Sequence, residues 1–381
     1  MKHRVMLAVG CAMAASAVAL PTFADSDVHE LREILEQQQD QIDALKNSRT
    51  GGHHGLGLGN TSIGGYGELH YNNLDNKKSG GADNKEIDFH RFVLFFNHEF
   101  SDSIRLNTEF ELEHSIAGEG QNGEVELEQA FIDFDLNEKH TARGGLFLIP
   151  VGIINETHEP ETFYGTERNP VEKNIIPATW WAGGASIYGE IAPGWSYDAA
   201  IHSGLNNDSY DIRSGRQKVS QASAEDLAYT GRIKWTGVPG LELAATLQLQ
   251  DNITQSTDPD ASATLIETHA VWTSGQMGLR ALYATWDVDG AGAAAVGRNE
   301  QTGYYIEPSY KISPKLGVFA RYNEWDENAG DTADSEFSQI DYGVNFWPHE
   351  QVVIKFDIQD QDAPAGQNEF DGFNLALGYS F

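Results

Sequence analysis

Cysteine is almost absent from this chain of 381 residues, and the single one, Cys11, lies within the first 24 residues. Those residues resemble a secretory signal: Lys2 and Arg4 open it, an apolar run continues to Leu20, and small residues follow. Without residues 1–24 the chain has no cysteine, so disulfide bonds are excluded as its source of stability. Lipidation of Cys11 is a weaker alternative, because most of the apolar run follows that residue.

Long apolar runs are also lacking. After Leu20 no stretch is long and apolar enough to form a membrane helix, and the mean hydropathy is −0.43. Neither observation excludes a transmembrane β-barrel, because only alternate residues of its strands face lipid.

Basic residues are few, with 25 Lys and Arg against 57 Asp and Glu, which gives a net charge of −32. Removal of Lys2 and Arg4 with the signal takes the net charge to −34, two units lower. Such acidity excludes nucleic acid as a partner and argues against attraction to anionic lipid through basic patches.

Catalytic motifs are lacking as well, since the chain has no Gly-x-Ser-x-Gly elbow, no His-Glu-x-x-His pair and no phosphate loop. We therefore expect no enzyme, no cofactor and no metal site, with a barrel enzyme of the outer membrane as the alternative. Seven histidines stand singly and are interpreted as residues of a barrel interior or an interface: His70, His90, His98, His114, His158, His202 and His269.

A heptad pattern is present in residues 25–47. Apolar side chains and one glutamine follow at spacings of three and four, from Val28 to Leu45, with Gln38 among them. Three heptads alone are marginally stable, so the pattern predicts a short coiled-coil helix around an oligomer axis. An amphipathic helix docked on its own domain is the alternative. Residues 48–61, with many glycines and the pair His53-His54, are expected to form a flexible linker.

Alternation dominates residues 62–381. In the last segment Phe373, Leu375, Leu377, Tyr379 and Phe381 alternate with small or polar residues, which predicts a strand with one apolar and one slim, wettable face. Sixteen strand-like segments are expected at 62–72, 87–100, 103–113, 125–136, 140–149, 183–192, 195–203, 227–237, 240–252, 263–274, 277–288, 301–312, 315–325, 337–347, 350–360 and 371–381.

The connections between these segments alternate in length. Seven tight turns are separated by eight longer polar loops, as about sixteen up-and-down strands require when both ends lie on the short-turn side. The fold class predicted is therefore all-β, a transmembrane antiparallel barrel over residues 62–381. We expect its last strand to pair with the strand that begins at Ser62, which removes both sheet edges.

Aromatic residues near the predicted strand ends are typical of the two girdles of a membrane barrel. Eight are assigned to these girdles: Tyr66, Phe100, Trp195, Trp235, Phe319, Tyr322, Trp347 and Phe381.

The longest connection, residues 150–182, is unusually apolar, with Ile175, Ile176, Trp180 and Trp181 among its members. Such a loop is expected to pack, and inside a wide barrel it would narrow the passage. The alternative is that it caps the barrel or contacts a neighbouring subunit. Its charged residues are the constriction candidates: Glu156, His158, Glu159, Glu161, Glu167, Arg168, Glu172 and Lys173.

Charged residues on the slim face of the strands are the candidates for lining the lumen: Arg105, Glu109, Glu111, Arg143, Glu190, Arg232, Lys234, Glu267, Arg321 and Lys355. Bases and acids are interleaved there, and the loops are acidic. The pattern favours weak selectivity or a preference for cations.

Three segments resemble the phosphate-selective porin O/P family of Gram-negative outer membranes: GGYGEL at 64–69, GGLFLIPVG at 144–152 and GGASIYG at 183–189. The resemblance implies a homotrimer of sixteen-strand channels, each with an inward-folded third loop, in contact with outer-membrane lipid and lipopolysaccharide. It places the N-terminal helix in the periplasm, and it implies that the barrel-assembly machinery reads Phe381. The family's phosphate specialists use rows of arginine and lysine, whereas here acids separate the bases.

We therefore expect an outer-membrane porin, a water-filled channel through which small hydrophilic solutes or ions diffuse passively. An anion- or phosphate-selective porin remains an alternative, as do a barrel enzyme and a secreted β-rich binding protein.

Overall fold

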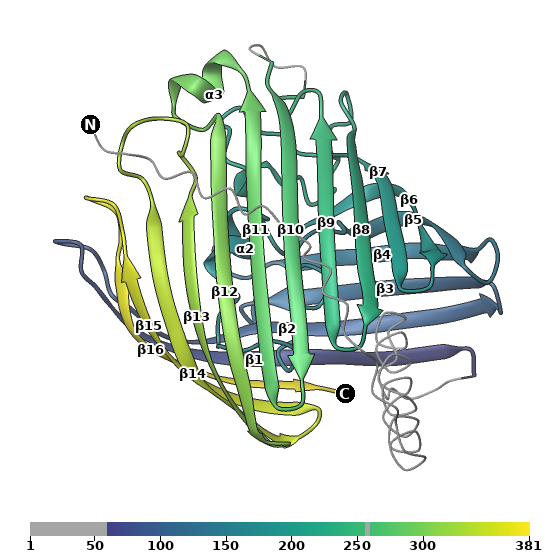
Figure 1. Ribbon diagram of the computed structural model, residues 1–381, viewed down its shortest axis with the longest axis horizontal. Helices are drawn as coiled ribbons and strands as arrows, with labels where there is room; N and C mark the ends of the chain where they lie inside the picture. Colours follow the sequence, from purple (N-terminus) through teal and green to yellow (C-terminus); the bar gives the residue numbers. More distant parts are fainter. Residues whose placement is uncertain (1–58, 256–259) are drawn as a thin grey trace, which may run out of the picture. The chain divides into compact units, whose positions relative to one another are not determined.

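The computed structural model describes residues 59–255 and 260–381, which form a closed antiparallel barrel (Figure 1). Every strand pairs with its neighbours in sequence, and β1 also pairs with β16. The strands are β1 (Thr61–Asn76), β2 (Asn84–Ser101), β3 (Ile104–Glu113), β4 (Val125–Asp135), β5 (His140–Leu148), β6 (Trp181–Ala192), β7 (Trp195–His202), β8 (Ala228–Val238), β9 (Leu241–Gln250), β10 (Ser262–Ser274), β11 (Met277–Asp289), β12 (Glu300–Ser313), β13 (Leu316–Asp326), β14 (Phe337–His349), β15 (Val352–Asp362) and β16 (Phe370–Ser380). The short helices are α2 (Pro170–Asn174), the 3-10 turn η1 (Arg213–Gly215) and α3 (Ala291–Ala295).

The barrel closes where β16 pairs with β1, in a continuous register from Tyr66↔Ser380 to Asn76↔Phe370. Beyond that register, Gly65 and Phe381 exchange two backbone hydrogen bonds of 3.0 and 2.9 Å. Because the last strand pairs with the first, the sheet has no open edge. The predicted closure is confirmed.

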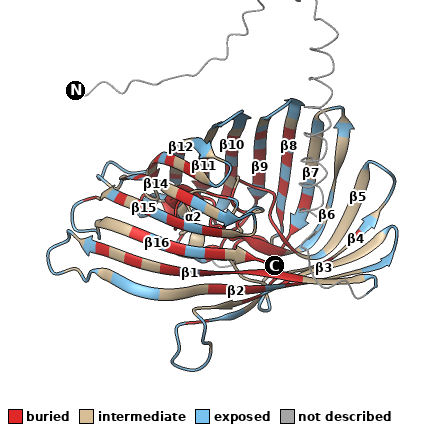
Figure 2. Ribbon diagram, turned by 90° about the horizontal axis from the view of Figure 1, so that it is seen from below, coloured by how far each residue is buried: buried red, intermediate tan, exposed pale blue. Residues whose placement is uncertain are grey.

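The two faces of each strand differ as the alternation predicts. On β16 the side chains of Leu375 and Leu377 are exposed on the outer face, while Asn374 and Ala376 are buried on the inner face. Figure 2 shows the same alternation of buried and exposed residues along β8, β9 and β10. The outer face is apolar around the ring, as a lipid-facing surface requires.

Connections of two to four residues join the strands at one end of the barrel, and connections of seven to 32 residues join them at the other. Several short turns need a residue with positive φ, which glycine adopts without strain: Gly194 (φ 76°), Gly240 (75°) and Gly275 (57°). The alternation of turn and loop lengths predicted from the sequence is confirmed.

The predicted strand positions agree with the structure, and the largest differences are at the first hairpin. There β1 extends four residues further than expected and β2 begins three residues earlier, and Leu74 pairs with Asn84. The residues of this hairpin are mostly polar and lack an alternating pattern, so the sequence does not mark them as strand. A bulge shifts the β1–β2 register between Glu68 and His70, so that Glu68 faces Arg91 and His70 faces Asp88.

The prediction of aromatic girdles is wrong for three of its eight residues. Tyr66 is fully buried and Phe319 is 6% exposed, both on the inner face. Trp347 also faces inward, with its ring 5.7 Å from that of Tyr164, a residue of the β5–β6 loop. These residues pack inside the barrel because that loop supplies apolar partners there, whereas Trp195, which is 43% exposed, lies on the outer face beside Trp235.

Among residues 59–255 and 260–381, no helix has the length and apolar character needed to cross a membrane. The predicted coiled coil of residues 25–47 and the first residues of the predicted linker, 48–58, lie outside the described part of the chain.

Substitution of Leu247, an exposed residue in the middle of β9, by lysine tests the outer face. In lipid we expect a loss of about 2–4 kcal/mol in the free energy of unfolding, because the charge lies near the bilayer centre. Val238→Lys, at the turn end of β8, serves as the control and costs about 0–1 kcal/mol. Denaturant unfolding in lipid vesicles measures both, and equal losses would contradict this assignment of the lipid face.

Candidate functional site

The loop from β5 to β6, residues 149–180, packs against the inner face of the barrel. Its residues Ile175, Ile176 and Trp180 form one buried cluster with Leu282 and Trp286 of β11. Trp286 also donates a hydrogen bond of 2.8 Å from its indole nitrogen to the carbonyl of Ile175. Figure 2 shows α2, which belongs to this loop, within the ring of strands. Each of the three loop side chains contributes about 2 kcal/mol to holding the loop there.

Polar residues of β13 to β15 bind the main chain of the same loop. The ammonium of Lys355 donates to the carbonyl of Gly165 (2.9 Å) and lies 3.5 Å from the ring centre of Phe163. Asp357 accepts from the backbone nitrogen of Thr166 (2.7 Å). Lys355, predicted as a lumen-lining base, therefore anchors the loop.

Glu172 is a second anchor, on α2. Its carboxylate accepts from the backbone nitrogens of Ile153 (2.9 Å) and Ile154 (2.6 Å) and from the hydroxyl of Tyr305 (2.8 Å). Asn169 caps the helix by accepting from the backbone nitrogen of Glu172. Burial raises the pKa of Glu172 despite these hydrogen bonds.

His158 is held between two acids, with its Nε2 atom 3.3 Å from Glu109 and 3.5 Å from Glu128. All three side chains are buried. Burial alone would lower the pKa of His158, but the hydrogen bonds with the two carboxylates raise it to about 10. Glu156, two residues earlier, forms an ion pair with Arg232 of β8.

A cavity of 260 Å³ lies between this loop and strands β1 to β4. Its lining consists of Glu68, His70, His90, Arg91, Glu113, His114, Glu126, Phe163, Thr166, Glu167, Arg168, Lys173, Ala178, Thr179, Trp181, Arg213, Arg216 and Lys218. Of the eight constriction candidates, Glu167, Arg168 and Lys173 line it. The other five lie elsewhere on the loop: Glu156, His158, Glu159, Glu161 and Glu172.

One wall of the cavity is basic. Arg213 and Arg216, from the loop between β7 and β8, stand beside Arg168 and Lys173. Their guanidinium groups bind backbone carbonyls, Arg213 that of Ala178 (3.0 Å) and Arg216 that of Thr179 (2.5 Å).

Within the described part of the chain, none of these four bases has a carboxylate within 4.0 Å, and Nη2 of Arg168 is buried without a hydrogen-bond partner. Burial, together with the charges of Arg216 and Arg168, lowers the pKa of Arg213 to about 9. Burial likewise lowers the pKa of Lys173; the charge of Glu167 opposes this shift, and the three arginines add to it. The arginines therefore repel one another and Lys173, and the charges of Glu167 and Glu126 offset part of this repulsion.

The rest of the cavity lining is mixed in charge. Glu167 accepts from Asn72 (3.1 Å) and lies 3.0 Å from His70, whose charge brings the pKa of Glu167 well below its usual range although burial opposes this. Glu68 pairs with Arg91 at 2.8 Å, and Lys218 pairs with Glu126. These residues form close ion pairs, in contrast to the four bases.

The bases predicted to line the lumen lie on the inner face, but most are paired with acids on the same or the next strand. Arg105 binds Asp135 (2.5 Å), Arg143 binds Asp133 (2.8 Å) and Arg321 binds Asp341 (2.9 Å). The remaining pairs are Arg232 with Asp198, Lys234 with Glu242, Glu267 with His269, Glu111 with Arg91 and Glu190 with Lys139. Because the opposite charges of each pair lie side by side, these pairs contribute little net electrostatic field to the lumen.

Sequence reasoning missed Arg213, Arg216 and Lys218, because no motif marks the loop between β7 and β8. A signal was available: three of the 25 bases of an acidic chain fall within six residues. A local excess of bases against a strongly negative background indicates a site rather than general solubility.

The closed barrel with an internally packed loop defines an outer-membrane channel of the porin class. The chain belongs to the family described as "Phosphate-selective porin O and P", whose profile matches residues 63–365. Family and fold together indicate a channel rather than an enzyme and the Gram-negative outer membrane as its location.

Among known proteins, an uncharacterized protein of Aquifex aeolicus (strain VF5) is 31% identical over 363 residues, covering 84% of this chain and 80% of that protein. The anion-selective porin from Comamonas acidovorans has a TM-score of 0.62 at 13% identity, covering 84% of this chain and 99% of its own. The outer membrane channel DcaP of Acinetobacter baumannii has a TM-score of 0.59 at 15% identity, with coverages of 84% and 97%. At such identities these two structures establish the shared fold.

The pairing of His158 predicts a pH-dependent stability. Because the pKa of His158 is raised from 6.5 to about 10, its stabilisation is complete below pH 6.5 and is lost as the pH rises through about 10. We expect His158→Gln to cost about 3 kcal/mol below pH 6.5 and progressively less towards pH 10. Denaturant unfolding in detergent at a series of pH values measures this difference. His349→Gln, at the exposed last residue of β14, is the control and should give no such convergence. A difference in stability between wild type and His158→Gln that does not change with pH would contradict the assignment.

Proposed function

We propose that the protein is a passive porin whose passage is narrowed by residues 149–180 and by the loop between β7 and β8, and that small anions are favoured at the narrow point. The observation that carries the proposal is the basic wall of Arg168, Lys173, Arg213 and Arg216 without carboxylate partners among the described residues. Small hydrophilic solutes would cross by diffusion, with size set by the two loops and charge preference by this wall.

Local charge outweighs total charge in such a passage. Charges beyond about 8–10 Å are largely screened at physiological ionic strength, so acidic residues of the outer loops contribute little at the narrow point. The charges of the paired residues on the inner face nearly cancel. The unpaired bases lie beside the cavity in a partly desolvated setting, where their field is strongest.

A second candidate is a weakly selective or cation-preferring porin. The observation in its favour is acidity, both of the chain as a whole, at −32, and of Glu113 and Glu126, which line the same cavity as the bases. Which of the two holds depends on whether the four bases or these two acids dominate the field along the path of a passing ion.

Reversal potentials in planar bilayers under a KCl gradient distinguish the two candidates. We expect anion preference for the wild type and a fall of about tenfold in the anion-to-cation permeability ratio for Arg168→Gln/Arg213→Gln/Arg216→Gln. A charge at about 8 Å from an ion is worth about 0.5 kcal/mol in water, and screening over one Debye length reduces this to about 0.2 kcal/mol. Three such charges act with opposite sign on the anion and the cation, so their removal changes the ratio by about 1.2 kcal/mol, which is roughly tenfold.

Two controls make this test specific. Replacement of the same three arginines by lysine keeps the charge and should keep the preference. Lys77→Gln/Lys78→Gln/Lys315→Gln removes the same charge at exposed positions outside the cavity and should change the ratio little. Cation preference of the wild type, or equal shifts in the two glutamine variants, would refute the role of the basic wall.

We further propose a homotrimer in which residues 25–47 form a periplasmic coiled coil joined to the barrel by the predicted linker of residues 48–61, whose last residue, Thr61, already belongs to β1. The heptad spacing of Leu31, Leu35 and Ile42 supports this assembly. The outer face would contact lipid and lipopolysaccharide, and the barrel-assembly machinery would recognise Phe381 as an assembly signal.

Disruption of the heptads tests the assembly. In Leu31→Ser/Leu35→Ser/Ile42→Ser the apolar seam is lost while the barrel is unchanged, so we expect trimers that dissociate at lower temperature. Light scattering of detergent-solubilised protein after stepwise heating measures the dissociation. Ser substitutions at Glu30, Glu33 and Asp43, outside the seam, are the control; equal dissociation temperatures for the two variants would argue against the coiled coil.

A further inference from the structure

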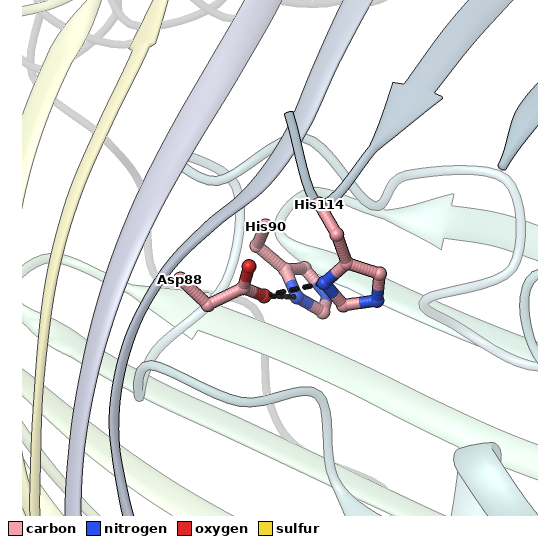
Figure 3. Close-up of side chains that lie close together, drawn as sticks. All are labelled: Asp88, His90 and His114. Carbon is pink, nitrogen blue, oxygen red and sulfur yellow. Dashed lines mark hydrogen bonds and ion pairs between the residues drawn. The ribbon is translucent and has the colours of Figure 1, made fainter. Parts of the chain in front are cut away.

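Three potential metal ligands meet at the end of the barrel that carries the long loops. Asp88 and His90 lie on β2, and His114 directly follows β3 (Figure 3). One carboxylate oxygen of Asp88, Oδ2, is 3.1 Å from Nδ1 of His90 and 2.8 Å from Nδ1 of His114. With one ligand atom taken from each residue, the three atoms lie within 4.8 Å of one another.

These spacings fit coordination of one ion. A tetrahedral site with metal–ligand distances of about 2.1 Å has ligand atoms about 3.4 Å apart. The Asp88–histidine distances are slightly shorter than this, as hydrogen bonds are, so an ion needs only small side-chain movements to replace the shared protons. Both imidazoles offer the same ring atom, Nδ1, to one point.

The surroundings hold the histidines in place. The ring of His70 stacks on that of His90 at 4.6 Å with an interplanar angle of 12°, and His70 is itself fixed by Glu68 and Glu167. The backbone nitrogen of His114 donates to the carbonyl of His90 (3.1 Å). His114 has a φ of 51°, a left-handed conformation that non-glycine residues rarely adopt, and this turns the residue as the chain leaves β3.

Two cavities meet at this cluster. Asp88 and His114 line one of 400 Å³, together with Glu86, and His90 and His114 line the 260 Å³ cavity beside the basic wall. The three side chains are between 19 and 37% exposed, so an ion can enter from water and keep water as its remaining ligand.

We propose that Asp88, His90 and His114 bind a divalent transition-metal ion of the Zn²⁺ type, at the junction of the two cavities. Two imidazoles and one carboxylate suit Zn²⁺, Ni²⁺ or Cu²⁺, whereas Mg²⁺ and Ca²⁺ prefer oxygen ligands in larger number. The bound ion adds two positive charges next to the passage and changes its conductance. This inference stands independently of the anion preference proposed above.

Other groupings of acids and histidines in the described residues are less suited. Glu109, Glu128 and His158 are fully buried and already form their own ion pairs, so water does not reach them. The groups around Glu111, Glu113 and Glu126 contain carboxylates alone.

Titration calorimetry with ZnCl₂ on the untagged, detergent-solubilised full chain tests the site. A His53→Gln/His54→Gln background removes the adjacent histidine pair of the linker as a competing ligand. In that background we expect one Zn²⁺ site per chain, weakened about tenfold or more by His90→Gln, by His114→Gln and by Asp88→Asn. His98→Gln, on the same strand β2 but near its other end, is the matched control and should bind as the background does. An excess of MgCl₂ should not compete.

Two further measurements keep the inference open to refutation if a variant folds poorly. X-ray absorption of the Zn²⁺-loaded background protein should show two imidazole nitrogens among the ligands. Zn²⁺ should change the single-channel conductance of the background protein. Each ligand variant should have the same conductance with and without Zn²⁺. Zn²⁺ affinity equal in the background and the ligand variants, or a spectrum without imidazole, would show that the cluster is only a hydrogen-bonded Asp–His–His group.

Discussion

The closed ring of backbone hydrogen bonds is the constraint on which the rest of this structure depends. In lipid a peptide group without a partner costs several kcal/mol, so every strand must pair on both sides. The chain meets this requirement by joining β16 to β1, with Gly65 and Phe381 exchanging the outermost hydrogen bonds. Closure then forces the side chains of each strand to divide between an outer apolar face and an inner face.

A ring of sixteen strands is too wide for its own side chains to fill, so the loop between β5 and β6 can pack inside it. Apolar residues of β10 and β11, such as Leu265, Leu282 and Trp286, face inward and bury Ile175 and Trp180 of that loop. Elsewhere the inner face carries bases paired with acids, as in Arg321 with Asp341. Among the described residues, the largest group of bases without a carboxylate partner lies in the loops, with Arg213 and Arg216.

The histidines that stand singly in the sequence form a cluster only in the folded barrel. His70, His90 and His114 belong to three different elements, yet the bulge between Glu68 and His70 and the turn after β3 bring them together at one end of the barrel. The cluster and the basic wall share one cavity, so a metal ion and a permeating ion would experience each other's charge.

The sequence by itself determined the number of strands, their positions and the outward face of the final strand. These follow from a period of two and from local turn residues such as Gly194 and Gly240, which do not depend on distant parts of the chain. Only the tertiary structure decided that Tyr66, Phe319 and Trp347 face inward, because an apolar strand residue suits a buried loop as well as it suits lipid. It also decided the gathering of Arg168 with Arg213 and of Asp88 with His114, since contacts between separate loops and strands leave no periodic trace in the sequence.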